Sequence, residues 1–573
     1  MNFTRPELLS LYDLLTNRLF QIPDYQRTYS WRKKQRRDLF NDIIKIREKD
    51  KEHFMATLVC LSKNKRQIGG SRFDVLDIVD GQQRITSLII LLKSLCFMLE
   101  SGNKEEKDIA DDLKKLLVKE KDETIILLQT NHDTSNVFSE YLRNNSKPSI
   151  SDLSIEAERN LSDAFSESEI FVKSWGEKWG LSSLYQIIMD KLKFILHIIE
   201  DEGIVYTVFE VLNSRGLDVD WLDKCKSLLL GIVYEVTEDK STINSTMIEL
   251  HTIWSNIYRT IGLNEIHGDE IIRFAATLLN QNNLSKSLSA QESLDFIRTY
   301  CGDKPRKVVY VSNWLLKVSK ELLIIRQNPF LDAVTKISHV RLLKLAIELR
   351  EDFSEDEKKE LRIIWEKVSF RIFGIAGKDS RSKVGEYVKL SQNIFRKQQI
   401  INEQKIAFPK DDIKRAIKNL GSEFEISEII REIKDKDLYE ANNWKDELRY
   451  FFYKYETYLN AKKGYNFPEI VWIHIWKSSL NQTIEHIYPQ SPSSNWQKLP
   501  PNNIHRLGNL TIVTPEINSE AYNKSFINKK VAYRKENRLL SLQKIVEEYD
   551  EWDIKNIERR EEELINWAIA EWG

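Results

Sequence analysis

One local arrangement near the N-terminus constrains the fold of this chain more than any other. The run Arg72–Val79 is rich in β-branched and apolar residues, which is typical of a buried strand. It leads through residues 80–84 (DGQQR) into Ile85–Leu99, an apolar run long enough for a buried helix. His53–Leu61 has the composition of a second strand. Strand, tight turn and helix in this order predict an α+β unit at this end of the chain.

The turn at residues 80–84 carries groups that suit a phosphate. Backbone N–H groups at a helix N-terminus attract anions, and Gly81 lets the backbone approach closely. Arg84 can bind a phosphate through two parallel hydrogen bonds, and Asp80 can hold Mg²⁺. Either of the two glutamines can orient a water. The alternative is a structural turn, with Arg84 in an ion pair and Trp31 in the core.

The rest of the chain is expected to be mostly helical. Its 573 residues exceed one hydrophobic core, and about 100–200 residues per domain indicate about three or four domains. Only 19 Gly and 12 Pro interrupt many Leu, Ile, Lys and Glu, a composition that favours helix. Residues 236–460 show one helical pattern after another and no fixed repeat.

Charge and cysteine content narrow the class of protein only a little. The 86 Lys and Arg nearly balance the 87 Asp and Glu, so net charge does not indicate a nucleic acid, although a local basic groove stays compatible with one. The four cysteines are too far apart for a zinc knuckle and are expected to be reduced thiols. No signal segment and no run of about 18 apolar residues is present. We therefore expect a cytoplasmic protein with no membrane partner.

Polar groups near the C-terminus suit the hydrolysis of a phosphodiester. A β-prone run ends in Glu485 and His486, a Pro/Ser/Asn-rich loop follows, and Leu507–Thr511 brings a Gly-Asn turn into a short strand. Hydrolysis needs a base for water, a cation for the phosphate and a group that orients the base. A neutral His486 suits the first role near pH 7. The oxygens of Glu485 and Asn518 suit Mg²⁺, which prefers oxygen ligands.

Three motifs carry a family resemblance at this end of the chain. They are EHIYPQ at 485–490, LGNLTIV at 507–513 and NSEAYNKSF at 518–526. Together they resemble the HNH (ββα-metal) nucleases, in the branch found at the C-terminus of GmrSD-type restriction enzymes. The alternative is that chance pairs of residues fall in a loop in this order.

The resemblance implies a role for each of these residues. His486 is the general base, and Asn509 braces the loop around it. Glu485 and Asn518 are metal ligands, with Asn523 a second candidate for the position of Asn518. Glu485 stands where Asp is common in other HNH proteins. Three basic residues are expected to contact backbone phosphate: Arg506, Lys529 and Lys530.

The N-terminal region resembles the same enzymes. Residues 22–31 (IPDYQRTYSW), followed by DGQQR, resemble their N-terminal DGQQR domain, which is related to the ParB/sulfiredoxin-like fold. Phe209–Gly216 with Asp223 and Lys226 resembles a third motif of that family. The resemblance implies a site that binds and hydrolyses a nucleoside triphosphate. Its residues would be Asp80, Gly81, Gln82, Gln83 and Arg84 at the phosphates, Tyr25, Gln26 and Arg27 along the lining, and Asn213 and Arg215 as neighbours.

Other basic segments and a further histidine receive no firm role. Residues 32–37 (RKKQRR) could follow a DNA backbone, but the solvated face of a helix is favoured. Residues 378–397 are basic with interleaved aromatic side chains and are a second candidate DNA surface. His505 lies in the loop near the nuclease motif and is left without a function.

These patterns predict a predominantly helical α+β protein in three domains. Residues 1–230 form a ParB/sulfiredoxin-like nucleotide-binding domain with NTPase activity, 231–440 a helical linker domain and 441–573 a ββα-metal HNH nuclease domain. The resemblance implies a type IV DNA endonuclease of antiphage defence. The enzyme would restrict double-stranded, modified phage DNA. It would depend on Mg²⁺ or another divalent cation and be regulated by a nucleoside triphosphate.

Two alternatives stay open. One is a toxin-like nuclease without modification dependence, and the other is a non-catalytic ParB-like protein switched by a nucleotide. The sequence leaves open the DNA modification, the preferred nucleotide and whether the chain forms a homo-oligomer.

Overall fold

The computed structural model describes most of the chain. The described residues are 6–23, 28–119, 126–130, 135–149, 153, 156–200, 221–236, 239–261, 268–302, 304–401, 404–433, 439, 445–492, 494, 496 and 498–573. The chain forms two compact units, one of Met1–Ala275 with Ser289–Lys320 and one of Ala276–Leu288 with Glu321–Gly573. The three predicted domains stay a prediction, because the division into units lies inside the predicted linker domain.

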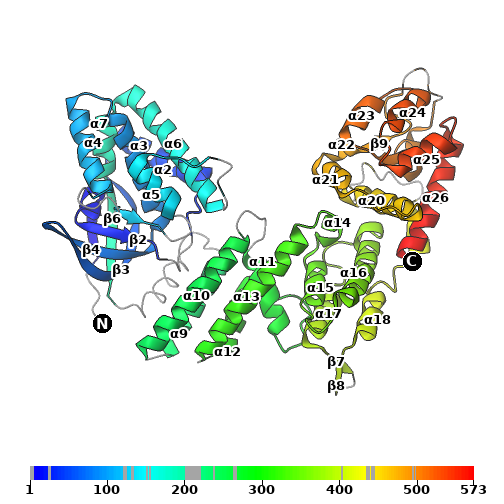
Figure 1. The fold of residues 1–573 in the computed structure, drawn as a ribbon, viewed down its shortest axis with the longest axis horizontal. Coiled ribbons are helices and arrows are strands. Elements are labelled where there is room, and N and C mark those ends of the chain that lie inside the picture. The colour runs from blue at the N-terminus through cyan, green and yellow to red at the C-terminus, as the bar shows by residue number, and fades with distance from the viewer. Residues whose placement is uncertain are drawn as a thin grey trace. The chain divides into compact units, whose positions relative to one another are not determined.

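The first unit contains a six-stranded mixed sheet (Figure 1). Its strands are β1 (Glu7–Ser10), β2 (Arg18–Gln21), β3 (His53–Ile68), β4 (Ser71–Asp80), β5 (Leu128–Gln129) and β6 (Leu192–Ile199), in the spatial order β1-β6-β3-β4-β2-β5. β3 and β4 form an antiparallel hairpin, and β2 runs parallel to both β4 and β5. Both strands expected here are confirmed. β3 extends beyond the predicted end because its last residues are polar and exposed, so they carry no apolar pattern.

Helices pack against this sheet through an apolar core. They are α1 (Leu11–Leu15), α2 (Lys33–Lys49), α3 (Gln82–Leu99), α4 (Lys104–Leu117), α5 (Ser135–Asn144), α6 (Glu156–Trp179), α7 (Leu181–Gln186) and the π-helix η2 (Ile187–Lys191). Leu88–Leu92 of α3 are fully buried in one core with Phe20, Leu76 and Ile78, which project from the sheet. By length and composition α3 could cross a membrane, but 83% of its residues are buried inside the protein, as in a core helix.

Further helices follow the sheet in the chain. They are α9 (Trp221–Val236), α10 (Lys240–Ile261), α11 (Gly268–Leu279), α12 (Ala290–Cys301) and α13 (Pro305–Arg326). The boundaries between the units fall within α11, just before α12 and within α13. The four cysteines lie in the first unit and are buried, without disulfide bonds.

Helices also dominate the second unit. They are α14 (Asp332–Thr335), α15 (Ser338–Glu348), α16 (Glu355–Ser369), the π-helix η3 (Phe370–Ile375), α17 (Val384–Arg396), α18 (Lys410–Leu420), α19 (Ile426–Ile433), α20 (Lys445–Lys462), α21 (Glu469–Lys477), α22 (Leu480–Thr483), α23 (Pro515–Ala521), α24 (Phe526–Arg534), α25 (Leu540–Glu548) and α26 (Ile554–Trp572). The short 3₁₀ turns η4 (Pro501–Asn503) and η5 (Leu507–Asn509) lie in the loop before the last strand. The predicted fold class, predominantly helical α+β, is confirmed.

A β-hairpin interrupts these helices and corrects one prediction. β7 (Gln398–Ile401) pairs antiparallel with β8 (Gln404–Ala407). The expectation of helix alone over residues 236–460 is therefore wrong at this point. Each strand has only four residues, two of them glutamine or lysine side by side, so alternation between polar and apolar positions is absent.

Candidate functional site

The C-terminal candidate site is built on two strands followed by a helix. β9 (Ile484–His486) pairs antiparallel with β10 (Leu510–Ile512), and α23 comes next in the chain. Leu510 lies opposite His486, and Thr511 lies opposite Glu485. Because successive side chains of a strand point to opposite faces, Glu485 and His486 enter different surroundings. Figure 1 shows β9 among the orange and red helices of this part of the chain.

His486 lies in a cluster of rings. Its side chain is buried, and its Nε2 lies 3.0 Å from Nδ1 of His505 and 3.4 Å from the amide nitrogen of Gln490. The ring of Tyr439 meets the His486 ring edge-on, with 4.6 Å between centroids, and stacks on His505. His505 was predicted to have no function, because no motif spacing indicates that a loop residue 19 positions after His486 returns to this strand.

The imidazole of His486 is held in its neutral form. Burial is the largest cause and lowers the pKa of His486 to about 3, and the nearby His505 and Lys529 act in the same direction. At neutral pH the ring therefore has one N–H and one lone pair, as a general base requires. If Nε2 donates to His505, the lone pair is on Nδ1.

The carboxylate of Glu485 is engaged by two donors from α24. Lys529 Nζ donates to Glu485 Oε1 at 2.6 Å, and the Tyr533 hydroxyl donates to the same oxygen at 2.9 Å. Lys529 and Tyr533 are four residues apart, which places them on one face of α24. Burial raises the pKa of Glu485 and lowers the pKa of Lys529, while their mutual attraction opposes both shifts. Glu485 is therefore satisfied inside the protein.

Asn509 holds the loop that follows β9. Its Oδ1 accepts from the backbone N–H of Tyr488 at 2.7 Å and from the Trp552 indole at 2.9 Å. Its Nδ2 donates to the backbone carbonyls of Tyr488 at 3.0 Å and Ile504 at 2.7 Å. The side chain is fully buried. This geometry is what a residue that braces the loop around His486 would have.

Asn518 reaches the neighbourhood of His486 through two other residues. Asn518 Nδ2 donates to the backbone carbonyl of Asn481 at 2.9 Å, and the Tyr439 hydroxyl donates to Asn481 Oδ1 at 2.9 Å. Tyr439 in turn packs on His486. Glu485 shares no hydrogen bond with Asn518, although the structure describes both residues.

The predicted pair of Mg²⁺ ligands does not fit this geometry. A cation at Glu485 Oε1 would displace Lys529 and leave a buried ammonium without its partner, which is costly. Asn518 has the chemistry of a ligand, because a carboxamide oxygen suits a hard cation. Within the described part of the chain, no group of three or more His, Cys, Asp or Glu side chains comes together to hold a metal.

The three basic residues expected at the DNA backbone bond within the protein. Arg506 is buried and pairs with the fully buried Glu561. Lys529 is fully buried, and Lys530 donates to the carbonyl of Tyr549 at 2.6 Å. The predicted phosphate contact is wrong for Arg506 and Lys529, since neither side chain is at the surface. The sequence shows their charge but not the partners that bury it.

At the N-terminal site, the turn at residues 80–84 has the predicted strand–turn–helix form. Gly81 precedes α3 with a φ of 94°, and a Cβ at this position would lie 2.8 Å from Leu58 Cδ1. Both facts require glycine here. Asp80 Oδ1 accepts from the backbone N–H of Gly81 at 2.8 Å, which closes the turn.

Gln83 ties the turn to the segment that precedes α2. It accepts from the backbone N–H of Ser30 at 2.8 Å and donates to the carbonyl of Thr28 at 3.0 Å. Gln82 and Gln83 are both buried. In this structure Gln83 therefore supports the chain, and orientation of a water stays a prediction for Gln82.

Arg84 is the cation of this turn. Its guanidinium lies 6.0 Å from the centre of the Trp31 ring. Burial lowers the pKa of Arg84, with Asp80 and Asp42 acting in the opposite direction. Trp31 is half-buried against the core, as the alternative interpretation expected.

The remaining residues predicted for this site lie outside the described residues. They are Tyr25, Gln26, Arg27, Asn213 and Arg215. Of the third motif, Asp223 and Lys226 lie on α9. Asp223 accepts from the Tyr258 hydroxyl at 2.5 Å, and the buried Lys226 lies over the Tyr258 ring at 4.9 Å.

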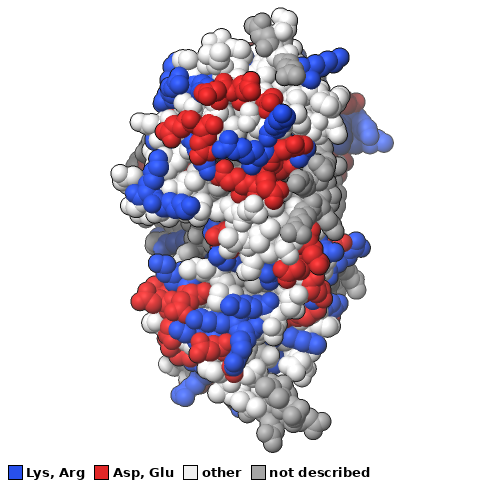
Figure 2. All heavy atoms as spheres, turned by 90° about the vertical axis from the view of Figure 1, so that its right-hand side faces the viewer, with Lys and Arg blue, Asp and Glu red and all other residues white. Residues whose placement is uncertain are grey.

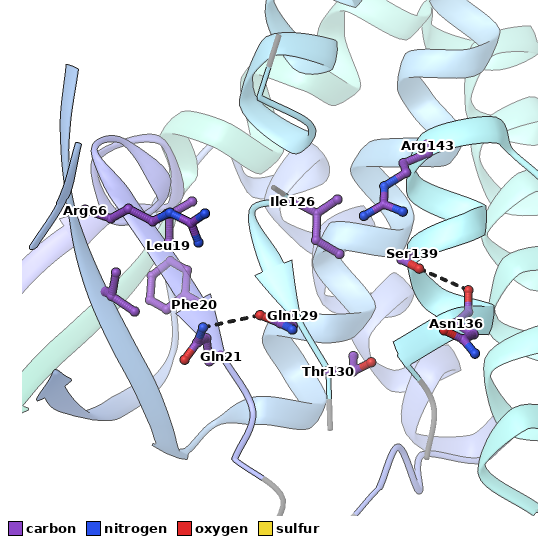
Figure 3. A pocket seen from close by; sticks show the side chains of 11 residues that line it. Leu19, Phe20, Gln21, Arg66, Ile126, Gln129, Thr130, Asn136, Ser139 and Arg143 are labelled. Carbon is purple, nitrogen blue, oxygen red and sulfur yellow. Dashed lines mark hydrogen bonds between the residues drawn. The ribbon is translucent and has the colours of Figure 1, made fainter. Parts of the chain in front are cut away.

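A cavity of about 350 Å³ lies at the β5 edge of the sheet (Figure 3). Residues of β2, β5 and α5 line it, with Arg66 of β3 and Arg143 of α5 on opposite sides. The Gln21 amide donates to Gln129 across part of it at 3.2 Å. None of residues 80–84 lines this cavity, so it is separate from the predicted phosphate turn.

Charges on the surface are mixed. Figure 2 shows basic and acidic side chains side by side on the face it draws. In the segment 378–397, three basic residues pair with nearby carboxylates: Arg381 with Asp379, Lys383 with Glu423, and Lys397 with Asp352. In the run 32–37, Arg36 is buried and binds Glu167 with two hydrogen bonds of 2.8 and 2.9 Å. Nearby acids thus balance part of the charge of the segment 378–397, and in the run 32–37 they pair with Arg36.

Comparison with known families finds one match in the N-terminal part of the chain and one in the C-terminal part. Residues 9–230 match the family described as GmrSD restriction endonuclease, N-terminal domain, and residues 424–567 match GmrSD restriction endonucleases, C-terminal domain. The two matches together cover more than half of the chain. No match was found among curated proteins. The chain belongs to the GmrSD-type restriction endonucleases, which makes it a type IV restriction endonuclease whose substrate is DNA.

Proposed function

We propose that the chain is an HNH endonuclease that restricts modified phage DNA under the control of a nucleoside triphosphate. Membership of the GmrSD type supports restriction and DNA cleavage. One observation supports the chemistry. The imidazole of His486 at the end of β9 is buried and neutral, and Asn509 holds the adjoining loop through hydrogen bonds to the backbone of Tyr488. The β9–β10–α23 order also agrees with a ββα nuclease.

In the proposed reaction His486 is the general base. Its lone pair takes a proton from water while the water oxygen bonds to phosphorus. The bond from phosphorus to the leaving sugar oxygen breaks, and that oxygen takes a proton from solvent. When His505 Nδ1 accepts from Nε2 of His486, this contact fixes the tautomer that leaves the lone pair of His486 on Nδ1. Asn509 keeps the adjoining loop in place.

Dependence on Mg²⁺ or another divalent cation is part of the proposal. When bound, such an ion supplies positive charge for the phosphate oxygens. Asn518 is the predicted ligand that suits it, through its carboxamide oxygen. We assign no step to the ion, because Glu485 is engaged by Lys529.

The turn at residues 80–84 is the proposed nucleotide site. The turn stands at the start of α3, where the backbone N–H groups of a helix N-terminus attract an anion, and Arg84 supplies a cation. We propose that nucleotide binding or hydrolysis here controls cutting by the C-terminal site. Arg84→Ala should weaken nucleotide binding by at least about tenfold, since a charged hydrogen bond is worth about 1.5–3 kcal/mol.

The function is tested by comparing wild type with His486→Ala on modified phage DNA and on an unmodified plasmid. Each protein is assayed with Mg²⁺ and with EDTA, with and without nucleoside triphosphate. We expect wild type to cut only the modified DNA, only with Mg²⁺, and His486→Ala to cut neither. Equal cutting of both DNAs would point to a nuclease without modification dependence. An unchanged phenotype in His486→Ala would favour the non-catalytic ParB-like alternative.

A further inference from the structure

Lys529 joins Glu485 to the backbone of His486. Its fully buried ammonium donates to Glu485 Oε1 at 2.6 Å and to the backbone carbonyl of His486 at 2.7 Å. The Tyr533 hydroxyl donates to the same Glu485 oxygen at 2.9 Å. Glu485 is thus connected to the backbone of His486 through Lys529, a residue of α24.

This connection restrains the end of β9. Moving the His486 carbonyl away from Lys529 would leave part of a buried ammonium unsatisfied, which costs more than the loss of an ordinary hydrogen bond. Glu485 keeps the ammonium in place by pairing with it. The direction in which the His486 imidazole points follows from the position of this backbone segment.

We propose that Glu485 is a positioning residue, which acts through Lys529 to fix the backbone of His486, and that it does not bind the cation of the reaction. The inference rests on the proposed role of His486 as base. A cation at Glu485 would meet Lys529 at the same oxygen, so two positive charges would compete for one buried carboxylate.

The test uses Glu485→Gln, Lys529→Met and the double variant that carries both substitutions. Each single variant leaves one buried charge or acceptor without its partner, whereas the double variant removes both charges together. Three quantities are measured: the unfolding midpoint, Mn²⁺ binding from the free-ion EPR signal with and without DNA, and single-turnover cleavage. Mn²⁺ binding is independent of whether the variant cuts.

We expect each single variant to lower the unfolding midpoint by about 10 °C, and the double variant to recover at least half of that loss. Mn²⁺ affinity should stay within about twofold of wild type in Glu485→Gln and in the double variant. The cleavage rate should fall in both, with unchanged DNA affinity, because the base is misplaced and not removed. If a single variant does not fold, the double variant still gives the metal reading.

The opposite pattern would overturn the inference. It is a loss of Mn²⁺ affinity of tenfold or more in Glu485→Gln, with an unchanged unfolding midpoint and no recovery in the double variant. Failure of the proposed function looks different: wild type would cut no DNA, while the metal and stability readings would still decide the role of Glu485.

Discussion

Asn509 allows the sharpest test of how the C-terminal site is held. Its fully buried carboxamide makes four hydrogen bonds, to both backbone groups of Tyr488, to the Ile504 carbonyl and to the Trp552 indole. A hydrogen bond contributes about 0.5–1.5 kcal/mol net. Four of them indicate that Asn509→Ala should lower the free energy of unfolding by about 4 kcal/mol.

The assay follows from the two kinds of bond that Asn509 makes. Urea unfolding gives the stability of Asn509→Ala and Asn509→Asp, and single-turnover cleavage gives the effect on His486. The aspartate can still accept from Tyr488 and Trp552, but its second oxygen faces the carbonyls of Tyr488 and Ile504. We expect cleavage to fall by at least about tenfold in both variants, since the loop next to the base loses its brace.

The control is Asn502→Ala, a change of the same kind at an exposed position in the same loop. It should alter stability by less than about 0.5 kcal/mol. If Asn509→Ala were within about 1 kcal/mol of wild type and cut DNA at the normal rate, the bracing argument would be refuted. That result would mean that water or a small backbone shift replaces all four bonds.

Three further predictions concern other parts of the chain. Gly81→Ala should lower the free energy of unfolding by about 1–3 kcal/mol, because the alanine would have a φ of 94° and its Cβ would lie 2.8 Å from Leu58 Cδ1. Gly70→Ala has open space around the new Cβ and should be near neutral, and thermal unfolding measures both variants. Arg36→Met should destabilise the chain by about 3–5 kcal/mol by breaking a buried ion pair, yet leave the salt dependence of DNA binding unchanged. Burial lowers the pKa of His339 from 6.5 to about 4, so the unfolded chain takes up a proton between these values and stability should fall by about 3 kcal/mol as pH drops through them. His339→Phe should flatten this part of the curve in urea unfolding at pH 7.5 and 4.5, and an equal slope in wild type and variant would contradict the assignment.

Local features of the N-terminal turn were predictable from the sequence. The apolar run before residues 80–84 predicts a strand and the apolar run after them predicts a helix, and the few residues between them predict a tight turn. The sequence predicted Gly81 for the approach of a phosphate to the backbone, whereas the positive φ and the contact with Leu58 are seen only in the structure. The role of Gln83 did not follow, because its partners Thr28 and Ser30 come from a segment more than 50 residues earlier.

The strands of the C-terminal site were also predictable, but their surroundings were not. β9 and β10 lie where the β-prone runs predicted them. Tyr439 and His505 join the His486 cluster only because the chain folds back, and neither belongs to a spaced motif. The same is true of Arg506. A basic residue near a nuclease motif suggests a contact with DNA, but in the structure Arg506 pairs with Glu561.

The pair Glu485 and His486 shows why adjacency in sequence is a poor guide to shared function in a strand. Side chains alternate between the two faces of a strand, so neighbours along it point in opposite directions, and the elements that pack on each face determine which groups each side chain contacts. Here α24 supplies Lys529 and Tyr533 to one face, while the loop after β9 supplies Gln490 and His505 to the other. An acid and a histidine that are adjacent in the sequence therefore indicate a candidate functional site, but the role of each one depends on residues that come later in the chain.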